Sequence, residues 1–399
     1  MYSPSETILQ KYADVLVNFA LRQGNGIKKW DVVFVQIPEC AKPMYLPLQK
    51  AILQAGAHPI FEYLPDDVAK HFYQQATDEQ ITFYPHHLLH GKVKQMTHVI
   101  SIIAENDKHE LRDVDPKKLS ARVQSRRPYV EKRHQKENEG KMSWTLALYG
   151  TPAMAAEANM PIEEYREEII KACYLDSENP IATRQKTNSE IDIIKKKLDA
   201  LKIQSLYMTW PDVNLHVKLW SDRQRMWGRW CNIPSFEIFT SPDRRGTNGR
   251  IKFNQPLYRH SQLITGISLT FKDGIIVDFD AETNKELLAE IIRTPNANKV
   301  WEFSLTDSRF SHITKFMAET LYDENRWGTE GNTHIAVGNS FAECRTGDVT
   351  KMTKKDMKEY WFNQSAEHVD IVSTAPRKVV ATLFDGSTKV IYEHGKFII

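Results

Sequence analysis

The first half of this 399-residue chain alternates between two hydrophobic periodicities, and this alternation limits its fold more than any other feature. Apolar runs rich in β-branched residues predict strands, and amphipathic segments between them predict helices. Strands separated by helices are typical of a mostly parallel sheet. The sequence therefore predicts an α/β N-terminal domain, with strands at 31–38, 59–63, 97–103 and 144–149 and helices at 7–22 and 44–56.

The second half has a different pattern, with shorter strands and more turns. The pair Asp273-Gly274 joins two apolar runs, 264–271 and 275–279, and Asp-Gly between such runs is a β-hairpin signature. A strong amphipathic helix at 187–201 precedes this part of the chain, so we place a boundary there. The prediction is an N-terminal α/β domain over 1–186 and a C-terminal α+β domain, with a largely antiparallel sheet, over 187–399.

Composition argues against several classes of function. The net charge is only +2, and the basic segment 116–141 is diluted by glutamates, so we predict no nucleic-acid partner. No apolar run is long enough to span a membrane, and no glycine-rich phosphate loop occurs. The four scattered cysteines form neither a disulfide framework nor a zinc-finger pattern. We therefore expect a cytoplasmic protein with no membrane partner.

Acids and imidazoles interrupt four apolar, strand-like runs of the second half. His368 and Asp370 are two residues apart, so in a strand both side chains project to the same face. Glu237 and Glu302 each lie in an apolar run, and His334 lies in another. A buried carboxylate is costly unless it is paired or bound to a metal. These residue types suit two divalent metal ions with one or two bridging carboxylates.

The order and flanks of these segments resemble the thermophilic metallopeptidase family that includes aminopeptidases T and S and leucyl aminopeptidases of that type. The resemblance covers most of the chain. Its motifs are Asn232–Pro242 (N-I-P-x-x-E-V-F-T-x-P, with Ile238 for valine), Glu302 before an apolar run, Asp323-Glu324-Asn325 with His334–Gly338 (D-E-N…H-x-A-x-G), and the final His368-Val369-Asp370.

The resemblance implies a homodimeric metallo-aminopeptidase that releases N-terminal amino acids from peptides with a free N-terminus. It implies that two divalent ions are held, zinc or cobalt, although manganese or iron also suits these ligand types. A metal-bound hydroxide is then expected to attack the first peptide bond, with Glu302 or Glu237 accepting its proton. The implied metal ligands are Glu237, Glu302, His334, His368 and Asp370.

Two alternatives remain open at this stage. A mononuclear Fe(II) ring-cleaving dioxygenase would need only His334, His368 and Asp370, and the extra carboxylates argue against it. A catalytically weak, peptide-binding homologue is suggested by Phe341, because the family has a tyrosine there whose hydroxyl is thought to stabilise the tetrahedral intermediate. Losing one such donor typically costs about 10²–10³ in rate.

Overall fold

The protein is described by a computed structural model that covers residues 4–399 except 225, 228–230, 244, 260, 261, 327, 339, 350, 351, 364 and 366. The chain divides into two compact units. The first comprises Met1–Thr183 with Arg229–Pro234, and the second comprises Arg184–Gly228 with Ser235–Ile399. Among the described residues, none of the helices combines the length and the apolarity that a bilayer crossing requires.

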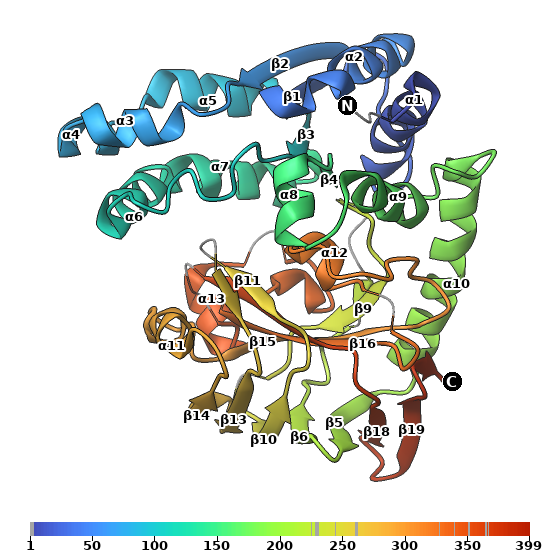
Figure 1. The fold of residues 1–399 in the computed structure, drawn as a ribbon. Helices are drawn as coiled ribbons and strands as arrows, with labels where there is room; N and C mark the ends of the chain where they lie inside the picture. The colour runs from blue at the N-terminus through green and yellow to red at the C-terminus, as the bar shows by residue number, and fades with distance from the viewer. Residues whose placement is uncertain are drawn as a thin grey trace. The chain divides into compact units, whose positions relative to one another are not determined.

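The first unit is built on a five-stranded sheet in the order β2-β1-β3-β4-β8, and every strand pairing in it is parallel. The central strands are buried on both faces, as their continuous apolar runs require. The predicted parallel sheet is therefore confirmed (Figure 1). The strands are β1 (Val32–Pro38), β2 (His58–Leu64), β3 (His98–Ile103), β4 (Ser143–Leu148) and β8 (Asn232–Ile233).

Helices pack in pairs beside this sheet: α1 contacts α2, α4 contacts α6, and α5 contacts α7. A core cluster of Phe34, Val93, Met96, Val99 and Met142 joins β1 and β3 to the α5 side. The helices are α1 (Glu6–Val15), a π-helix (Leu16–Ala20), α2 (Tyr45–Gln54), α3 (Ala69–Gln75), α4 (Asp78–Thr82), α5 (His86–Gln95), α6 (Pro116–Ser125), α7 (Arg127–Asn138), α8 (Pro152–Glu157) and α9 (Ile162–Ala172).

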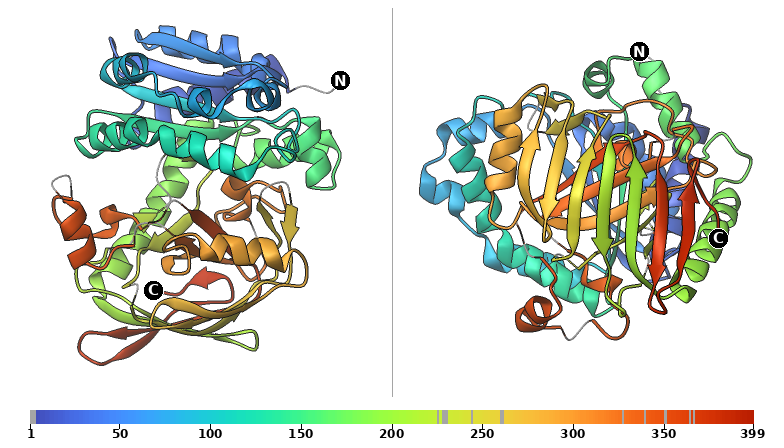
Figure 2. Two further views of the ribbon diagram at one scale, coloured as in Figure 1. Left: turned by 90° about the vertical axis from the view of Figure 1, so that its left-hand side faces the viewer. Right: turned by 90° about the horizontal axis from the view of Figure 1, so that it is seen from below.

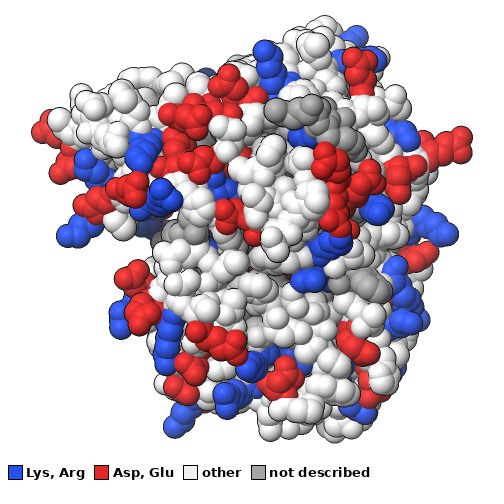
Figure 3. Space-filling model, in the orientation of Figure 1, with Lys and Arg blue, Asp and Glu red and all other residues white. Residues whose placement is uncertain are grey.

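The basic segment of the sequence forms α6 and α7, and several of its charges have structural partners. Lys136 Nζ donates to the carbonyl oxygens of Val93 and Met96, at 2.8 and 2.6 Å, where α5 ends. A cation at a helix C-terminus is favourable because the last carbonyls have no intrahelical donors. Arg127 pairs with Glu131 on the same helix face. Acidic and basic side chains are interspersed over the face drawn in Figure 3.

The second unit contains two large antiparallel sheets, which lie face to face in Figure 2, and a separate two-stranded antiparallel sheet within residues 257–264. The larger has the order β14-β13-β10-β6-β5-β18-β19-β20, and the smaller has the order β17-β16-β15-β9-β7. The largely antiparallel C-terminal sheet predicted from the sequence is thus confirmed. The larger sheet comprises β5 (Ile203–Trp210), β6 (Val213–Lys218), β10 (Thr247–Lys252), β13 (Ser268–Lys272), β14 (Ile275–Asp280), β18 (Lys378–Leu383), β19 (Thr388–Glu393) and β20 (Lys396–Phe397).

The smaller sheet is the more deeply buried of the two. All residues of β15 and β16 are buried, whereas β6 alternates between buried and exposed positions. One face of the larger sheet therefore meets solvent, as antiparallel sheets allow. The smaller sheet comprises β7 (Met226–Trp227), β9 (Glu237–Thr240), β15 (Val300–Thr306), β16 (Asn332–Gly338) and β17 (His368–Ser373). The remaining strands and α-helices are β11 (Leu257–Arg259), β12 (Gln262–Ile264), α10 (Pro180–Ala200), α11 (Lys285–Arg293), α12 (Thr320–Asp323) and α13 (Lys354–Glu359), and short 3-10 helices lie at Glu39–Met44 and Ala342–Cys344.

The predicted Asp273-Gly274 hairpin is present as β13 and β14. Both turn residues have positive φ, at 50° and 74°, which the right-handed twist of a two-residue hairpin requires. Glycine reaches this region without steric cost, and aspartate tolerates it better than most residues.

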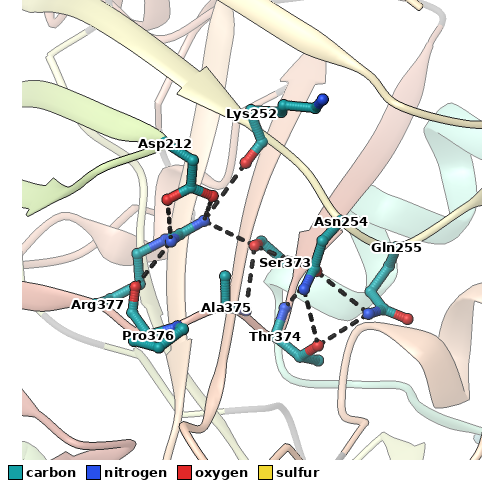
Figure 4. Close-up of polar contacts among 9 residues, drawn as sticks. All are labelled: Asp212, Lys252, Asn254, Gln255, Ser373, Thr374, Ala375, Pro376 and Arg377. Carbon is teal, nitrogen blue, oxygen red and sulfur yellow. Dashed lines mark hydrogen bonds and ion pairs between the residues drawn. The ribbon is translucent and has the colours of Figure 1, made fainter. Parts of the chain in front are cut away.

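A buried arginine fixes the chain where it passes from the smaller sheet to the larger one. Arg377, which is 1% exposed, forms a bidentate ion pair with Asp212 in the β5–β6 turn, at 2.8 and 3.0 Å. Arg377 Nη2 also donates to Ser373 Oγ, the last residue of β17, at 2.7 Å. Asn254 joins this network by accepting from the Thr374 backbone N–H (Figure 4). The end of β17 is thereby tied to two strands of the other sheet.

Candidate metal centre

The register of the smaller sheet places the predicted ligands on one face. His334 lies opposite Ser304, and Asp370 and Glu302 both lie opposite Ala336. Residues that face each other across an antiparallel pair share a face, and so do residues two apart on a strand. His334 and Ala336 are two apart, as are Ser304 and Glu302, so all of these side chains project together.

Glu237 and His368 extend the same face at its two ends. Glu237 lies opposite Thr306, two residues beyond Ser304, and its Oε2 accepts a hydrogen bond from Ser304 Oγ at 2.9 Å. His368 lies opposite Gly338. The five residues thus come from four strands of one sheet, and they meet because of strand register rather than closeness in sequence.

The side chains form a close cluster around His334. Its Nε2 lies 3.1 Å from Glu237 Oε2, 3.5 Å from Glu302 Oε1 and 4.0 Å from Asp370 Oδ1. Glu237, Glu302 and His334 each offer a ligand atom, and these three atoms lie within 4.8 Å of one another, which is the spacing of a metal site. Asp370 Oδ2 lies 2.8 Å from His368 Nε2, so the cluster continues to the second imidazole.

Burial differs across the cluster. Glu237, Glu302, His334 and Asp370 are all less than 10% exposed, whereas the His368 side chain is 44% exposed. The group therefore has a buried core and one edge, at His368, that meets solvent. A site that must admit a substrate requires such an open edge.

The pKa values of the cluster are shifted because several acids lie close together in a buried place. Burial raises the pKa of Glu302 to about 7, and the neighbouring Glu237 adds to this although His334 opposes it. Burial would lower the pKa of His334, but Glu237 and Glu302 outweigh it and raise the pKa well above 6.5. For Asp370, burial raises the pKa, and the charge of His368 more than offsets this and lowers it below 3.8.

One residue of this site has no role in the sequence-based prediction. Glu324 follows α12 and is 7% exposed. Burial and then the charges of Glu237 and Asp370 raise the pKa of Glu324 well above 4.5. The neighbouring Asn325 hydrogen-bonds both Glu324 and the backbone N–H of Phe236, the residue before Glu237, so this turn lies beside the cluster. The sequence contains a signal for it, because Asp323-Glu324 places two acids in a short turn whose neighbours Leu321 and Tyr322 are apolar or aromatic.

These residues fit a divalent metal by the chemistry of their donors. Carboxylate oxygens and imidazole nitrogens are the ligand atoms that zinc, cobalt, manganese and iron accept. The cluster holds four carboxyl groups and two imidazoles, so its acids outnumber its bases. Buried charges are stable when they are paired or coordinate a metal, and a divalent cation would offset this surplus.

Aromatic rings border the cluster beside His368. The ring of Trp301 lies 3.9 Å from the His368 imidazole, edge to face, and 4.5 Å from the ring of Phe341. Phe341 also contacts Phe239 at 5.4 Å, and its backbone N–H donates to Ser241 Oγ at 3.0 Å. Phe341 is therefore separated from His368 by a single ring, that of Trp301.

Comparisons with known proteins identify the family of this chain. The sequence matches the family described as Thermophilic metalloprotease (M29) over residues 5–397. It is 26% identical to Aminopeptidase 2 of Geobacillus stearothermophilus, with 98% of each chain covered. It is 24% identical to Aminopeptidase T of Thermus thermophilus, with 96% of this chain and 98% of that one covered.

The fold has a counterpart among solved structures. Wild-type AmpT from Thermus thermophilus superposes with a TM-score of 0.84 at 22% sequence identity, covering 98% of this chain and 99% of that one. The family match spans nearly the whole sequence and both units. This chain is therefore a member of the thermophilic metalloprotease family M29.

Proposed function

We propose that this protein is a metal-dependent aminopeptidase that releases N-terminal residues from short peptides with a free N-terminus. The observation that carries the proposal is the buried Glu237, Glu302 and His334 cluster in a member of a metalloprotease family. Two relatives that are covered almost end to end are named aminopeptidases. A homodimer in the cytoplasm remains a prediction that belongs to the same proposal.

In this proposal the metal ligands are Glu237, Glu302, His334, His368 and Asp370. Two divalent ions held there would lower the pKa of a bound water, which makes hydroxide available near neutral pH, and would polarise the carbonyl of the first peptide bond. Glu302 or Glu237 accepts the proton of the attacking water. Without a cation, burial raises the pKa of Glu302 to about 7. A bound divalent cation would lower this pKa and keep the carboxylate ionised.

Glu324 adds a further carboxyl group to this proposal. Because its pKa is raised well above 4.5 by burial and by the neighbouring acids, it can hold a proton in the absence of a cation. It serves either as an additional ligand or as a second proton acceptor beside Glu302.

The proposal is tested by elemental mass spectrometry of protein purified without chelator, together with hydrolysis of aminoacyl anilides and short peptides. We expect about two metal ions per chain and release of the N-terminal residue, which a chelator abolishes and Zn²⁺, Co²⁺ or Mn²⁺ restores. One iron per chain without hydrolysis would favour the dioxygenase. Protein that binds no metal under any condition would leave a peptide-binding homologue.

Substituting Phe341 by tyrosine tests whether the missing hydroxyl limits the rate. The ring of Phe341 packs on Trp301, and Trp301 packs on the His368 imidazole, so the added hydroxyl would lie within two ring contacts of a proposed ligand. We expect kcat to rise about tenfold, less than the 10²–10³ that a fully aligned oxyanion donor contributes. Steady-state kinetics measure this, with Phe362→Tyr as a control. An unchanged kcat would mean that another group fills the role or that peptides are not the substrate.

A further inference from the structure

The turn that follows α12 holds a buried asparagine whose side chain touches two parts of the metal centre. Asn325 is 0% exposed. Its Oδ1 accepts a hydrogen bond from the backbone N–H of Phe236 at 2.7 Å. Its Nδ2 donates to Glu324 Oε1 and to the carbonyl oxygen of Leu321, both at 3.3 Å.

The hydrogen bond between Asn325 and the Phe236 backbone helps to position Glu237, the next residue of the chain. Glu237 is the first residue of β9, a strand of only four residues, and its pairing with Thr306 is the last on that side of β15. The residues after Glu237 are therefore fixed by pairing in the sheet, whereas the residue before it is not. Asn325 fixes the residue immediately before it, across 89 positions of sequence.

The contact with Glu324 fixes a second carboxyl group of the cluster. The orientation of the amide is determined by its partners, because the Phe236 N–H is a donor and must face the oxygen. The amino group then points at Glu324 Oε1 and Leu321 O. The asparagine amide supplies an acceptor for the Phe236 N–H and donors for Glu324 Oε1 and Leu321 O, which a carboxylate or a hydroxyl of similar size cannot do together.

The turn itself is held by other residues. The Asp323 carboxylate accepts hydrogen bonds from the backbone N–H groups of Met317 and Glu319, at 2.7 and 3.0 Å. Asn332 Nδ2 donates to the carbonyl oxygens of Asp323 and Arg326, at 3.2 and 3.1 Å. Changing the Asn325 side chain therefore leaves these anchors of the turn in place.

We propose that Asn325 is a positioning residue of the metal centre, which sets the placement of the Glu237 and Glu324 carboxylates relative to each other. This inference rests on the proposed metal-dependent function. Partners that orient metal ligands typically contribute about 10–100-fold to metal affinity or activity when they are removed.

The test compares two buried asparagines in the full-length protein. Asn325→Asp keeps the acceptor for Phe236 N but places an oxygen opposite Glu324 Oε1. Asn363→Asp is the matched control, because Asn363 is 2% exposed and its Nδ2 donates to the backbone carbonyls of Asn296 and Gly338. Co²⁺ is the probe, with affinity measured by chelator competition, geometry by visible absorption, and the Tm of the metal-free protein measured in parallel.

We expect Asn325→Asp to weaken Co²⁺ binding by about 10–100-fold, to alter the cobalt spectrum and to lower kcat more than it changes KM. Asn363→Asp should lower the Tm while keeping the wild-type Co²⁺ affinity and spectrum. Asn325→Ser, which removes the Nδ2 donor without adding charge, should weaken Co²⁺ binding by about tenfold. This variant provides the test if Asn325→Asp does not fold.

The inference is overturned if either Asn325 variant folds and binds Co²⁺ with wild-type affinity and spectrum. Co²⁺ binding by the wild type that depends on Asn325, without any peptide hydrolysis, would support the positioning role and contradict the aminopeptidase. A wild type that binds no Co²⁺ would overturn both.

Discussion

Replacing Glu302 by glutamine is expected to lower kcat by about 10²–10⁴-fold, the range for a lost general base. Glutamine has the same shape but no negative charge, so it is a poor metal ligand and cannot accept a proton. Glu302 is 3% exposed and lies 3.5 Å from His334 Nε2, at the centre of the cluster. Kinetics with an aminoacyl anilide at saturating metal measure the effect.

The same variant should not unfold the protein. Glu302 is crowded by other buried acids, which raise its pKa along with burial, so a neutral amide relieves repulsion. We expect the Tm of the metal-free variant to equal or exceed that of the wild type. Glu393→Gln, on β19 and paired with Lys378 at 3.1 Å, is the control and should keep full activity. Wild-type activity in Glu302→Gln would show that the site is assigned wrongly.

Substituting Asp212 by alanine is expected to lower the free energy of unfolding by about 3 kcal/mol, because it leaves a buried guanidinium without its carboxylate. Arg377 is 1% exposed and pairs with both oxygens of Asp212. The Asp212 side chain is 27% exposed, so water partly replaces it and the loss stays at the lower end of the range for buried pairs. Urea unfolding followed by circular dichroism measures the change.

Two further variants show whether the loss of stability in Asp212→Ala comes from the broken ion pair or from shortening an aspartate to alanine. Adding Arg377→Met to Asp212→Ala should restore much of the lost stability, because no unpaired charge remains. Asp280→Ala removes an exposed partner of Lys285 and should change little. If the double variant were no more stable than Asp212→Ala alone, the unpaired charge would not be the cause of the loss.

Local patterns in the sequence account for most of the elements but not for all of their ends. The run Val32–Val35 predicts a strand because all of its residues are β-branched or aromatic, and β1 includes it. Helix α10 begins at Pro180, seven residues before its predicted start. Its first two turns include Thr183, Arg184 and Gln185, which lack the apolar spacing on which that prediction depended. The helix predicted over 7–22 is present as α1 followed by the π-helix at Leu16–Ala20, and the periodicity does not signal that change of winding.

The candidate site was predictable where a ligand stands out within its own strand. His368 and Asp370 are two apart, and Glu237 and Glu302 are acids in apolar runs, so each is conspicuous locally. Glu324 stands out only as half of the Asp323-Glu324 pair, and Asn325 does not stand out at all. Both lie in a short turn that meets the cluster only through tertiary packing. A strand pattern gives the face on which a residue lies, but it does not give the loop that packs over that face.

The proposed ligands are spread over four strands, so a metal ion bound by all of them would stabilise only the native strand pairing. A slip of β17 by one residue against β16 would turn His368 and Asp370 to the opposite face, away from His334. Only chains with the correct pairing then hold a complete ligand set. Because a ligand that binds the native state alone draws the equilibrium toward it, a cation present during refolding would select correctly registered molecules over slipped ones.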